Sequence, residues 1–194
     1  ATADIDFNFS NQKLKEIKII NYKQDNKELK GLVKLSKEFK PYKSLEFDLK
    51  NNGKKTSIKI LRNKDLNTLD LKGDYLDFSK TLKETLIEKQ KEDSFLIQLQ
   101  PVKINLEVKE ILVGEQKSIY NVDSKLKYEN KLFKEVELYS KLKNKKEFDL
   151  KIKSKENSRE LVINSNDAGL FLNTFNINKS GKEGELALHG TYDD

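Results

Sequence analysis

The chain has 194 residues, a net charge of +6 from 38 Lys or Arg against 32 Asp or Glu, and no cysteine, methionine or tryptophan. Without cysteine it forms no disulfide, thiol nucleophile or iron–sulfur cluster. A single histidine, His189, excludes metal sites built from several imidazoles. The length suits one domain or a segment of a longer repetitive sheet.

The basic excess raises the question of nucleic acid. Of the 38 basic residues only Arg62 and Arg159 are arginines, although arginine forks carry much of the recognition of phosphates and bases. The lysines alternate with Asp and Glu along the chain and do not cluster in a basic stripe. We therefore expect a solvated lysine face and no nucleic-acid partner.

The dominant pattern is an alternation of apolar and charged residues with a period of two. Its clearest apolar sets are Leu45, Phe47 and Leu49; Val102, Ile104, Leu106 and Val108; and Phe148, Leu150 and Ile152. Successive side chains of a strand point to opposite faces, so each segment has one dry face and one charged face. This pattern predicts a mainly β fold, an antiparallel sheet with one face in water, in which the last two sets share the dry side.

Turn residues punctuate these alternating segments. Asn52-Gly53 predicts a two-residue hairpin. Pro41 and Pro101 fall near strand starts or breaks. In chain order, strands are predicted near residues 4–9, 14–22, 29–36, 44–51, 55–62, 67–77, 94–100, 102–113, 118–129, 132–142, 147–153, 159–164 and 185–192.

Two short helices are predicted to interrupt the sheet. Leu82, Leu86 and Ile87 recur at helical spacing in a segment near 79–90. The second helix, near 167–175, follows the N-cap residues Asn166 and Asp167. We expect both to pack over an end of the sheet.

Residues that carry chemistry elsewhere do not form a site in this sequence. Gly53-Lys54-Lys55-Thr56 lacks the upstream glycine of a phosphate-binding loop, so a hairpin turn is expected. His189 points away from the face of Leu186 and Leu188, towards water, and no companion residue is predicted to orient it. Asp193-Asp194 point to opposite faces of a strand. No catalytic residue, metal ligand or cofactor is predicted.

Two interpretations of the apolar faces remain open. In one, they are the inner faces of a β-sandwich, a structural or interaction module that binds a protein partner through a sheet edge. In the other, a curved sheet forms a U-shaped trough whose groove is lined by Val102, Ile104, Leu106, Val108, Phe148, Leu150 and Ile152. Composition and periodicity by themselves favour the sandwich.

Two segments resemble the AsmA-like superfamily, in particular its large YhdP-type proteins. Residues 161–172, Leu-Val-Ile-Asn-Ser-Asn-Asp-Ala-Gly-Leu-Phe-Leu, are similar to the family's strand, acidic Asp-Ala-Gly turn and leucine-rich helix, which a Gly-ended strand follows, as at Gly184 to Gly190. Upstream, residues 73–78, Gly-Asp-Tyr-Leu-Asp-Phe, resemble its strand-to-helix element. The matching motif residues are Gly73, Asp77, Asp167, Ala168, Gly169, Gly184 and Gly190.

The resemblance covers residues 67–194, while residues 1–66 match only as alternating strands. It implies a non-enzymatic bridge-like lipid transfer protein, whose apolar trough carries phospholipid acyl chains between inner and outer membranes and supports outer-membrane integrity. It further implies the periplasmic portion of a Gram-negative protein anchored in the inner membrane, with membrane proteins as additional partners. The missing methionine predicts that this sequence is an excised fragment.

Overall fold

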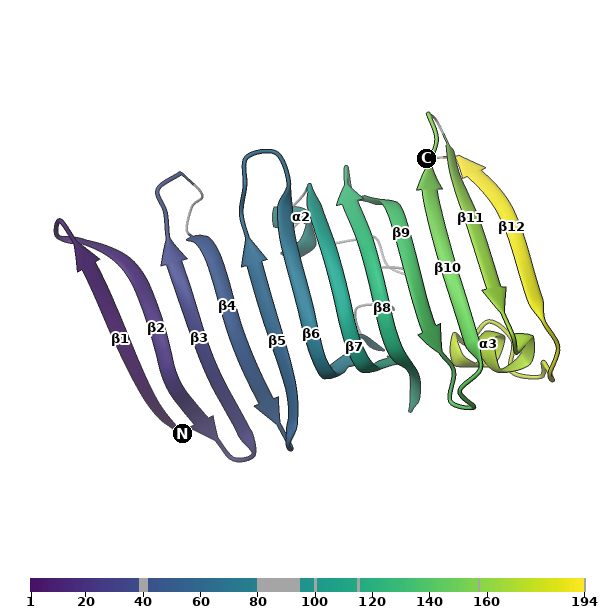
Figure 1. Ribbon diagram of the computed structural model, residues 1–194, viewed down its shortest axis with the longest axis horizontal. Helices are drawn as coiled ribbons and strands as arrows, with labels where there is room; N and C mark the ends of the chain where they lie inside the picture. The colour runs from purple at the N-terminus through teal and green to yellow at the C-terminus, as the bar shows by residue number, and fades with distance from the viewer. Residues whose placement is uncertain (39–41, 80–94, 100, 115, 157, 194) are drawn as a thin grey trace.

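The computed structural model describes residues 1–38, 42–79, 95–99, 101–114, 116–156 and 158–193. These residues form one open sheet of 12 strands whose spatial order equals the order in the chain. The sheet is therefore long across its strands, with β1 (Thr2–Ser10) at one end and β12 (Leu186–Asp193) at the other (Figure 1). The mainly β fold predicted from the alternation is confirmed.

Between these edge strands the elements follow the predicted order closely. They are β2 (Lys13–Gln24), β3 (Lys27–Leu35), β4 (Tyr42–Asn51), β5 (Lys54–Leu61), β6 (Asn67–Asp77), α2 (Phe95–Leu99), β7 (Val102–Gly114), β8 (Lys117–Glu129), β9 (Leu132–Lys141), β10 (Glu147–Ser154), β11 (Ser158–Ser165) and α3 (Ala168–Thr174).

Tight turns join many of the neighbouring strands. The predicted hairpin at Asn52-Gly53 is confirmed: both residues have positive φ, 49° and 80°, between the paired residues Asn51 and Lys54. Positive φ at both central positions matches the right-handed twist of the flanking strands. Asn11-Gln12 makes the same kind of turn between β1 and β2, at φ of 50° and 59°, without a glycine.

One pair of strands departs from the predicted antiparallel arrangement. β6 and β7 run parallel, with Leu69 opposite Ile104, whereas the other neighbouring pairs are antiparallel. A parallel pair requires a long crossover connection, and residues 78–101 provide it. The strand predicted near 94–100 is wrong, because Phe95–Leu99 in this connection is helical. A short apolar run does not distinguish a strand from a buried helical turn.

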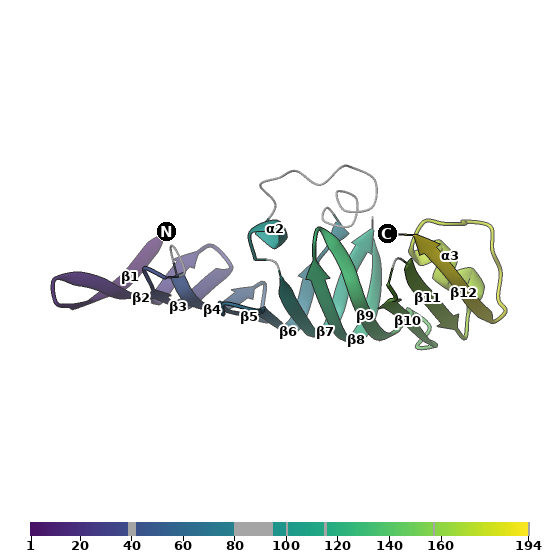
Figure 2. The ribbon, with the colours of Figure 1, turned by 90° about the horizontal axis from the view of Figure 1, so that it is seen from above.

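The predicted C-terminal helix is confirmed as α3. Asp167 is its N-cap, with extended backbone (φ −152°, ψ 91°) and a side chain that accepts a hydrogen bond from the Leu170 amide. The helix predicted near 79–90 lies outside the described residues, apart from Ser79. α2 and α3 lie on the same side of the sheet (Figure 2).

A two-sheet sandwich is not formed, because the described strands all belong to one open sheet. The sheet also continues without a break across residue 66, since β5 pairs with β6 from Thr56 opposite Gly73 to Leu61 opposite Thr68. No helix in the part of the chain described by the structure is long and apolar enough to cross a membrane.

The core lies on one face of the central strands, against the two helices. Its buried members are Ile60, Leu69, Leu71, Leu99, Val102, Ile104, Leu106, Val108, Ile111, Ile119, Val122, Tyr128, Leu142, Phe148 and Phe171. Side chains from one face of the sheet therefore supply most of the core, and the helices supply Leu99 and Phe171.

The alternation of buried residues changes phase at one level of the sheet. Buried residues are three positions apart at Val108 and Ile111 in β7, and again at Ile119 and Val122 in β8. Asn121, between the last two, has a left-handed backbone (φ 50°). Because both strands change phase together, their apolar residues stay on the same face along their full length.

Candidate functional site

Two rows of residues, apolar except at Gly31, Ser124 and Gly190, cross the sheet on one face. In the pairing of neighbouring strands, each member of a row lies opposite the next. The first row is Phe7, Ile17, Val33, Leu45, Ile60, Leu69, Ile104, Leu126, Val136, Ile152, Leu161 and Gly190. The second is Ile5, Ile19, Gly31, Phe47, Ile58, Leu71, Leu106, Ser124, Leu138, Leu150, Ile163 and Leu188. We call these the apolar rows.

The structure brings the predicted groove residues together on this face. Ile104 and Ile152 belong to the first row, and Leu106 and Leu150 to the second. The two alternating sets therefore share one side of the sheet, as the period predicts. The predicted members that are buried are Val102, Ile104, Leu106, Val108 and Phe148, so they belong to the core, whereas Leu150 and Ile152 are half-buried.

The helices α2 and α3 cover only part of the length of the apolar rows. Leu99 of α2 and Phe171 of α3 pack into the core of the central strands, and the Phe171 ring lies 5.2 Å from the Phe148 ring. At the N-terminal end of the sheet, Ile5 and Phe7 are 45% and 55% exposed. The open part of this face lies on the first strands, away from the residues singled out in the sequence.

The sequence analysis did not predict groove residues at the N-terminal end of this face, although the alternating pattern is also present there. Ile5, Phe7 and Phe9 alternate with Asp4, Asp6 and Asn8 in the same way as the predicted groove residues alternate with their polar neighbours. Alternation alone does not report exposure, because exposure depends on where the helices pack. The positions of α2 and α3 are a property of the tertiary structure.

The opposite face is covered by pairs of opposite charges on adjacent strands. Glu46 lies 3.0 Å from Lys59, and Asp74 lies 2.8 Å from Lys109. The hydrogen bond from Lys109, followed by the one from the Lys55 amide, lowers the pKa of Asp74. Exposed pairs of this kind contribute little each to stability, so their main consequence is a face that stays in water.

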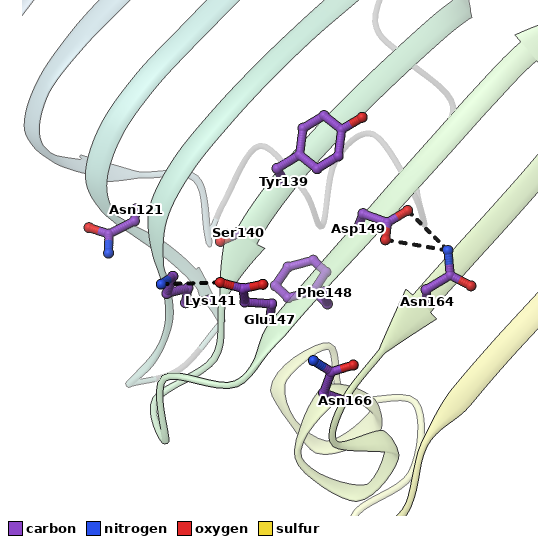
Figure 3. Close-up of a pocket in the computed structure, with 9 residues that line it drawn as sticks. All are labelled: Asn121, Tyr139, Ser140, Lys141, Glu147, Phe148, Asp149, Asn164 and Asn166. Atoms are coloured by element: carbon purple, nitrogen blue, oxygen red, sulfur yellow. Dashed lines mark hydrogen bonds and ion pairs between the residues drawn. The ribbon is translucent and has the colours of Figure 1, made fainter.

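A shallow polar depression of ≈ 330 Å³ lies on this charged face, over β8 to β11 (Figure 3). The Asn164 amide donates to both carboxylate oxygens of Asp149, at 3.1 and 3.3 Å, and Lys141 pairs with Glu147 at 3.2 Å. Its carboxylates are therefore engaged by neighbouring side chains. Among the described residues no group of three or more His, Asp or Glu could hold a metal ion.

The C-terminal motif residues hold α3 against the segment that precedes β12. Asp167 accepts from the Leu170 amide at 2.9 Å and from the Asn144 side chain at 2.8 Å. The Ala168 amide donates to the Gly184 carbonyl at 2.7 Å. Gly184 itself has φ +110°, a conformation that favours glycine. These contacts position α3 against the chain that precedes β12.

Two of the other motif residues, Gly73 and Asp77, also have structural roles. Gly73 lies opposite Thr56, and a Cβ atom there would be 2.4 Å from the Lys55 carbonyl oxygen, so only glycine fits. Asp77 accepts a hydrogen bond from the Ser79 amide at 2.9 Å at the end of β6. Gly190, in contrast, has open space where a side chain would be.

His189 faces water, as predicted, but it has a companion that the sequence did not indicate. Its Nε2 lies 2.6 Å from Oε1 of Glu160 on β11. Glu160 is opposite Thr191, two residues along β12, and a diagonal cross-strand neighbour lies within reach of a long side chain. The hydrogen bond from His189, followed by that from Lys155, lowers the pKa of Glu160.

His189→Ala is expected to raise the pKa of Glu160 towards its ordinary value of 4.5, because the strongest partner of the carboxylate is lost. A carboxyl group with a lowered pKa in the folded state stabilises the protein at pH values above its ordinary pKa, and this stability is lost as the pH falls through the folded-state pKa. The variant should therefore lose less stability than the parent when the pH is lowered from the ordinary pKa of Glu160 through its folded-state pKa. NMR titration of Glu160 and unfolding at several pH values measure these effects. Thr191→Ala is the matched control, and an unchanged Glu160 titration in His189→Ala would contradict the pairing.

No protein-family model matches this chain, and no curated protein or solved structure is found to be similar to it.

Proposed function

We propose that this chain is a non-enzymatic segment of a periplasm-spanning lipid transfer protein. In this proposal the apolar rows carry the acyl chains of phospholipids between the inner and outer membranes. The observation that carries it is the extent of the rows, which are interrupted at Gly31, Ser124 and Gly190 but reach from β1 to β12 on one face. The resemblance of residues 67–194 to the AsmA-like superfamily points in the same direction.

The direction of the rows suits an elongated apolar ligand. They run across the strands, along the long axis of the sheet (Figure 1). With a strand spacing of roughly 4.8 Å, 12 strands extend over about 50 Å. Each methylene moved from water to an apolar surface gains about 0.8 kcal/mol, so the exposed and half-buried members of the rows would stabilise an acyl chain lying along them.

The two faces of the sheet differ in polarity. Paired lysines and acids keep one side of the sheet in water, while Ile5, Phe7, Phe9 and Leu188 leave apolar surface exposed on the other. Contiguous exposed apolar surface is uncommon on soluble proteins and marks an interaction site. Since α2 and α3 pack on the central strands, an acyl chain would bind first to the rows on β1 to β4.

A photo-crosslinking amino acid at Ile19 in the full-length protein tests this proposal in cells. Ile19 is half-buried in the second apolar row. Lys18, the adjacent residue on the charged face, is the matched control. After irradiation, mass spectrometry should find phospholipid attached at position 19 and several-fold less at position 18.

The mutation Val33→Asp supplies an independent measurement. Val33 lies between Ile17 and Leu45 in the first row, and a carboxylate there would place charge against hydrocarbon at a cost of several kcal/mol. The phospholipid adduct at position 19 should fall sharply in this variant and persist in Lys34→Asp. Equal lipid labelling at positions 18 and 19, or attachment of protein alone at position 19, would contradict the proposal.

A further inference from the structure

The two arginines of the chain, among 38 basic residues, both lie on the face of the apolar rows. Arg159 precedes Leu161 of the first row by two residues on β11. Arg62 follows Ile60 of the first row by two residues, and its amide continues the pairing of β5 with β4 by donating to the Lys43 carbonyl at 2.9 Å. Alternate side chains of a strand share a face, so both guanidinium groups are on the side of the rows.

Each guanidinium group is held against a tyrosine ring. The guanidinium carbon of Arg62 lies 5.5 Å from the centre of the Tyr42 ring, and that of Arg159 lies 4.5 Å from the centre of the Tyr192 ring. Tyr42 packs against the hydrophobic core, and Tyr192 pairs with Arg159 across β11 and β12. All four residues are half-buried. Stacking on an aromatic ring orients the planar guanidinium group and leaves N–H donors along its edge for a ligand.

Both arginines lie on the same long side of the rows. Arg62 directly follows the end of β5, and Arg159 is the second residue of β11. In Figure 1 this is the upper side, where β5, β10 and β12 end and where β4 and β11 begin. Arg62 is also next to β4, so it lies where the open rows on β1 to β4 meet the central strands that the helices cover.

The opposite long side of the rows has a different character. There, the level of this face beyond the second row holds no Lys, Arg, Asp or Glu from Leu49 on β4 to Val122 on β8. The same is true from Ser140 on β9 to Leu186 on β12. The arginines therefore border the rows on one long side, and the level that borders them on the other is uncharged.

A guanidinium group beside an apolar surface fits a phosphate diester that carries acyl chains. Arginine binds phosphate oxygens through two parallel N–H···O bonds, whereas lysine offers a point charge. A guanidinium group has five N–H donors, so a contact within the chain leaves others for a ligand. In a phospholipid the phosphate lies next to the acyl chains, which matches the arrangement of the arginines beside the rows.

We propose that Arg62 and Arg159 bind the phosphate groups of phospholipids whose acyl chains lie on the apolar rows. This inference rests on the lipid-transfer function proposed above and assigns the head groups to the side of the sheet where β5 and β10 end (Figure 1). β5 and β11 are six strands apart, about 29 Å at roughly 4.8 Å per strand, so the two arginines bind different lipid molecules.

Binding of three soluble probes to the purified chain tests this proposal. They are dihexanoyl phosphatidylcholine below its micelle-forming concentration, dihexanoylglycerol, which lacks the phosphate, and glycerophosphocholine, which lacks the acyl chains. None has a net charge, so the charge of +6 on the chain favours none of them by non-specific attraction. The phospholipid should bind at least about tenfold more tightly than either of the others, as measured by isothermal titration calorimetry.

NMR locates the phosphate in the complex. The chain has two arginines, so its spectrum contains two arginine Nε–H signals. Both signals should shift when dihexanoyl phosphatidylcholine is added, and both should stay in place when dihexanoylglycerol is added.

The variant Arg62→Gln/Arg159→Gln removes both guanidinium groups. It should bind the phospholipid no more than about twofold more tightly than dihexanoylglycerol, whose own affinity should remain that of the parent. Lys59→Gln/Lys153→Gln is the matched control, because it removes the same charge from exposed lysines on the opposite face of β5 and β10. This control should keep the preference of the parent. The comparison of the three probes on the unmodified chain needs no variant to fold.

Three outcomes would overturn the proposal. They are equal binding of the two acylated probes, equal binding of the phospholipid and glycerophosphocholine, and arginine signals that do not respond to the phospholipid. If both acylated probes bind equally, the lipid-transfer proposal stands and the assignment of the arginines fails. If neither acylated probe binds and position 19 acquires no phospholipid in cells, the lipid-transfer proposal fails and this inference fails with it.

Discussion

Phe171→Ala is expected to destabilise the protein by about 3–5 kcal/mol, the usual range for removing a buried phenylalanine. The Phe171 ring is 3% exposed and lies 5.2 Å from the ring of Phe148 and 4.9 Å from the ring of Phe175. Its loss removes the ring contact between α3 and Phe148 of β10, and leaves a cavity among aromatic rings. Denaturant unfolding followed by far-ultraviolet circular dichroism measures the change.

Ile177→Ala is the control for this variant. Ile177 lies shortly after α3 and is 66% exposed, so its truncation should change the free energy of unfolding by less than about 0.5 kcal/mol. A similar effect of both substitutions would mean that the Phe148–Phe171–Phe175 cluster does not stabilise the docked helix.

Gly169→Ala is expected to separate α3 from the chain that packs on it. A Cβ atom at this position would lie 2.6 Å from the Lys182 carbonyl carbon, 2.8 Å from the Gly181 oxygen and 2.9 Å from the Glu183 nitrogen. All three are backbone atoms and cannot rotate away. Overpacking of this kind costs about 1–3 kcal/mol, and more where the backbone has to move.

Gly190→Ala is the matched substitution for this test. It also adds one methyl group at a motif glycine, but nothing lies within 4 Å of the added atom. Unfolding should therefore change by less than about 0.5 kcal/mol, and hydrogen exchange of the α3 amides should increase in Gly169→Ala alone. Equal stability of the two variants would show that the contact between α3 and residues 181–183 is not tight.

An alternating sequence pattern does not reveal whether its apolar residues are buried or exposed. Val102 and Ile5 occur in equally clear alternations, yet Val102 is fully buried and Ile5 is 45% exposed. Burial of Val102 depends on neighbouring strands on both sides and on helices packed over the central sheet. Ile5 lies on β1, which pairs within the described residues with β2 alone.

The partner of His189 was unpredictable for a related reason. Glu160 is 29 residues away in the chain, and the two side chains meet because β11 and β12 pair in one particular register. A shift of that register by one residue would place them on opposite faces. Register across a connection that contains α3 depends on how the helix packs, as the contacts of Asp167, Ala168 and Gly169 indicate.

By itself, the sequence determined the elements that depend on local physics. The period of two specified the strands and the shared face of the apolar residues within each alternating set, Asn52-Gly53 specified its hairpin, and Asp167 specified the start of α3. The tertiary structure alone decided that the strands form one sheet and not two, that β6 and β7 are parallel, and that residues 95–99 are helical. These features depend on contacts between residues far apart in the chain, and alternation with a period of two is equally compatible with either face being covered by a helix, a second sheet or a ligand.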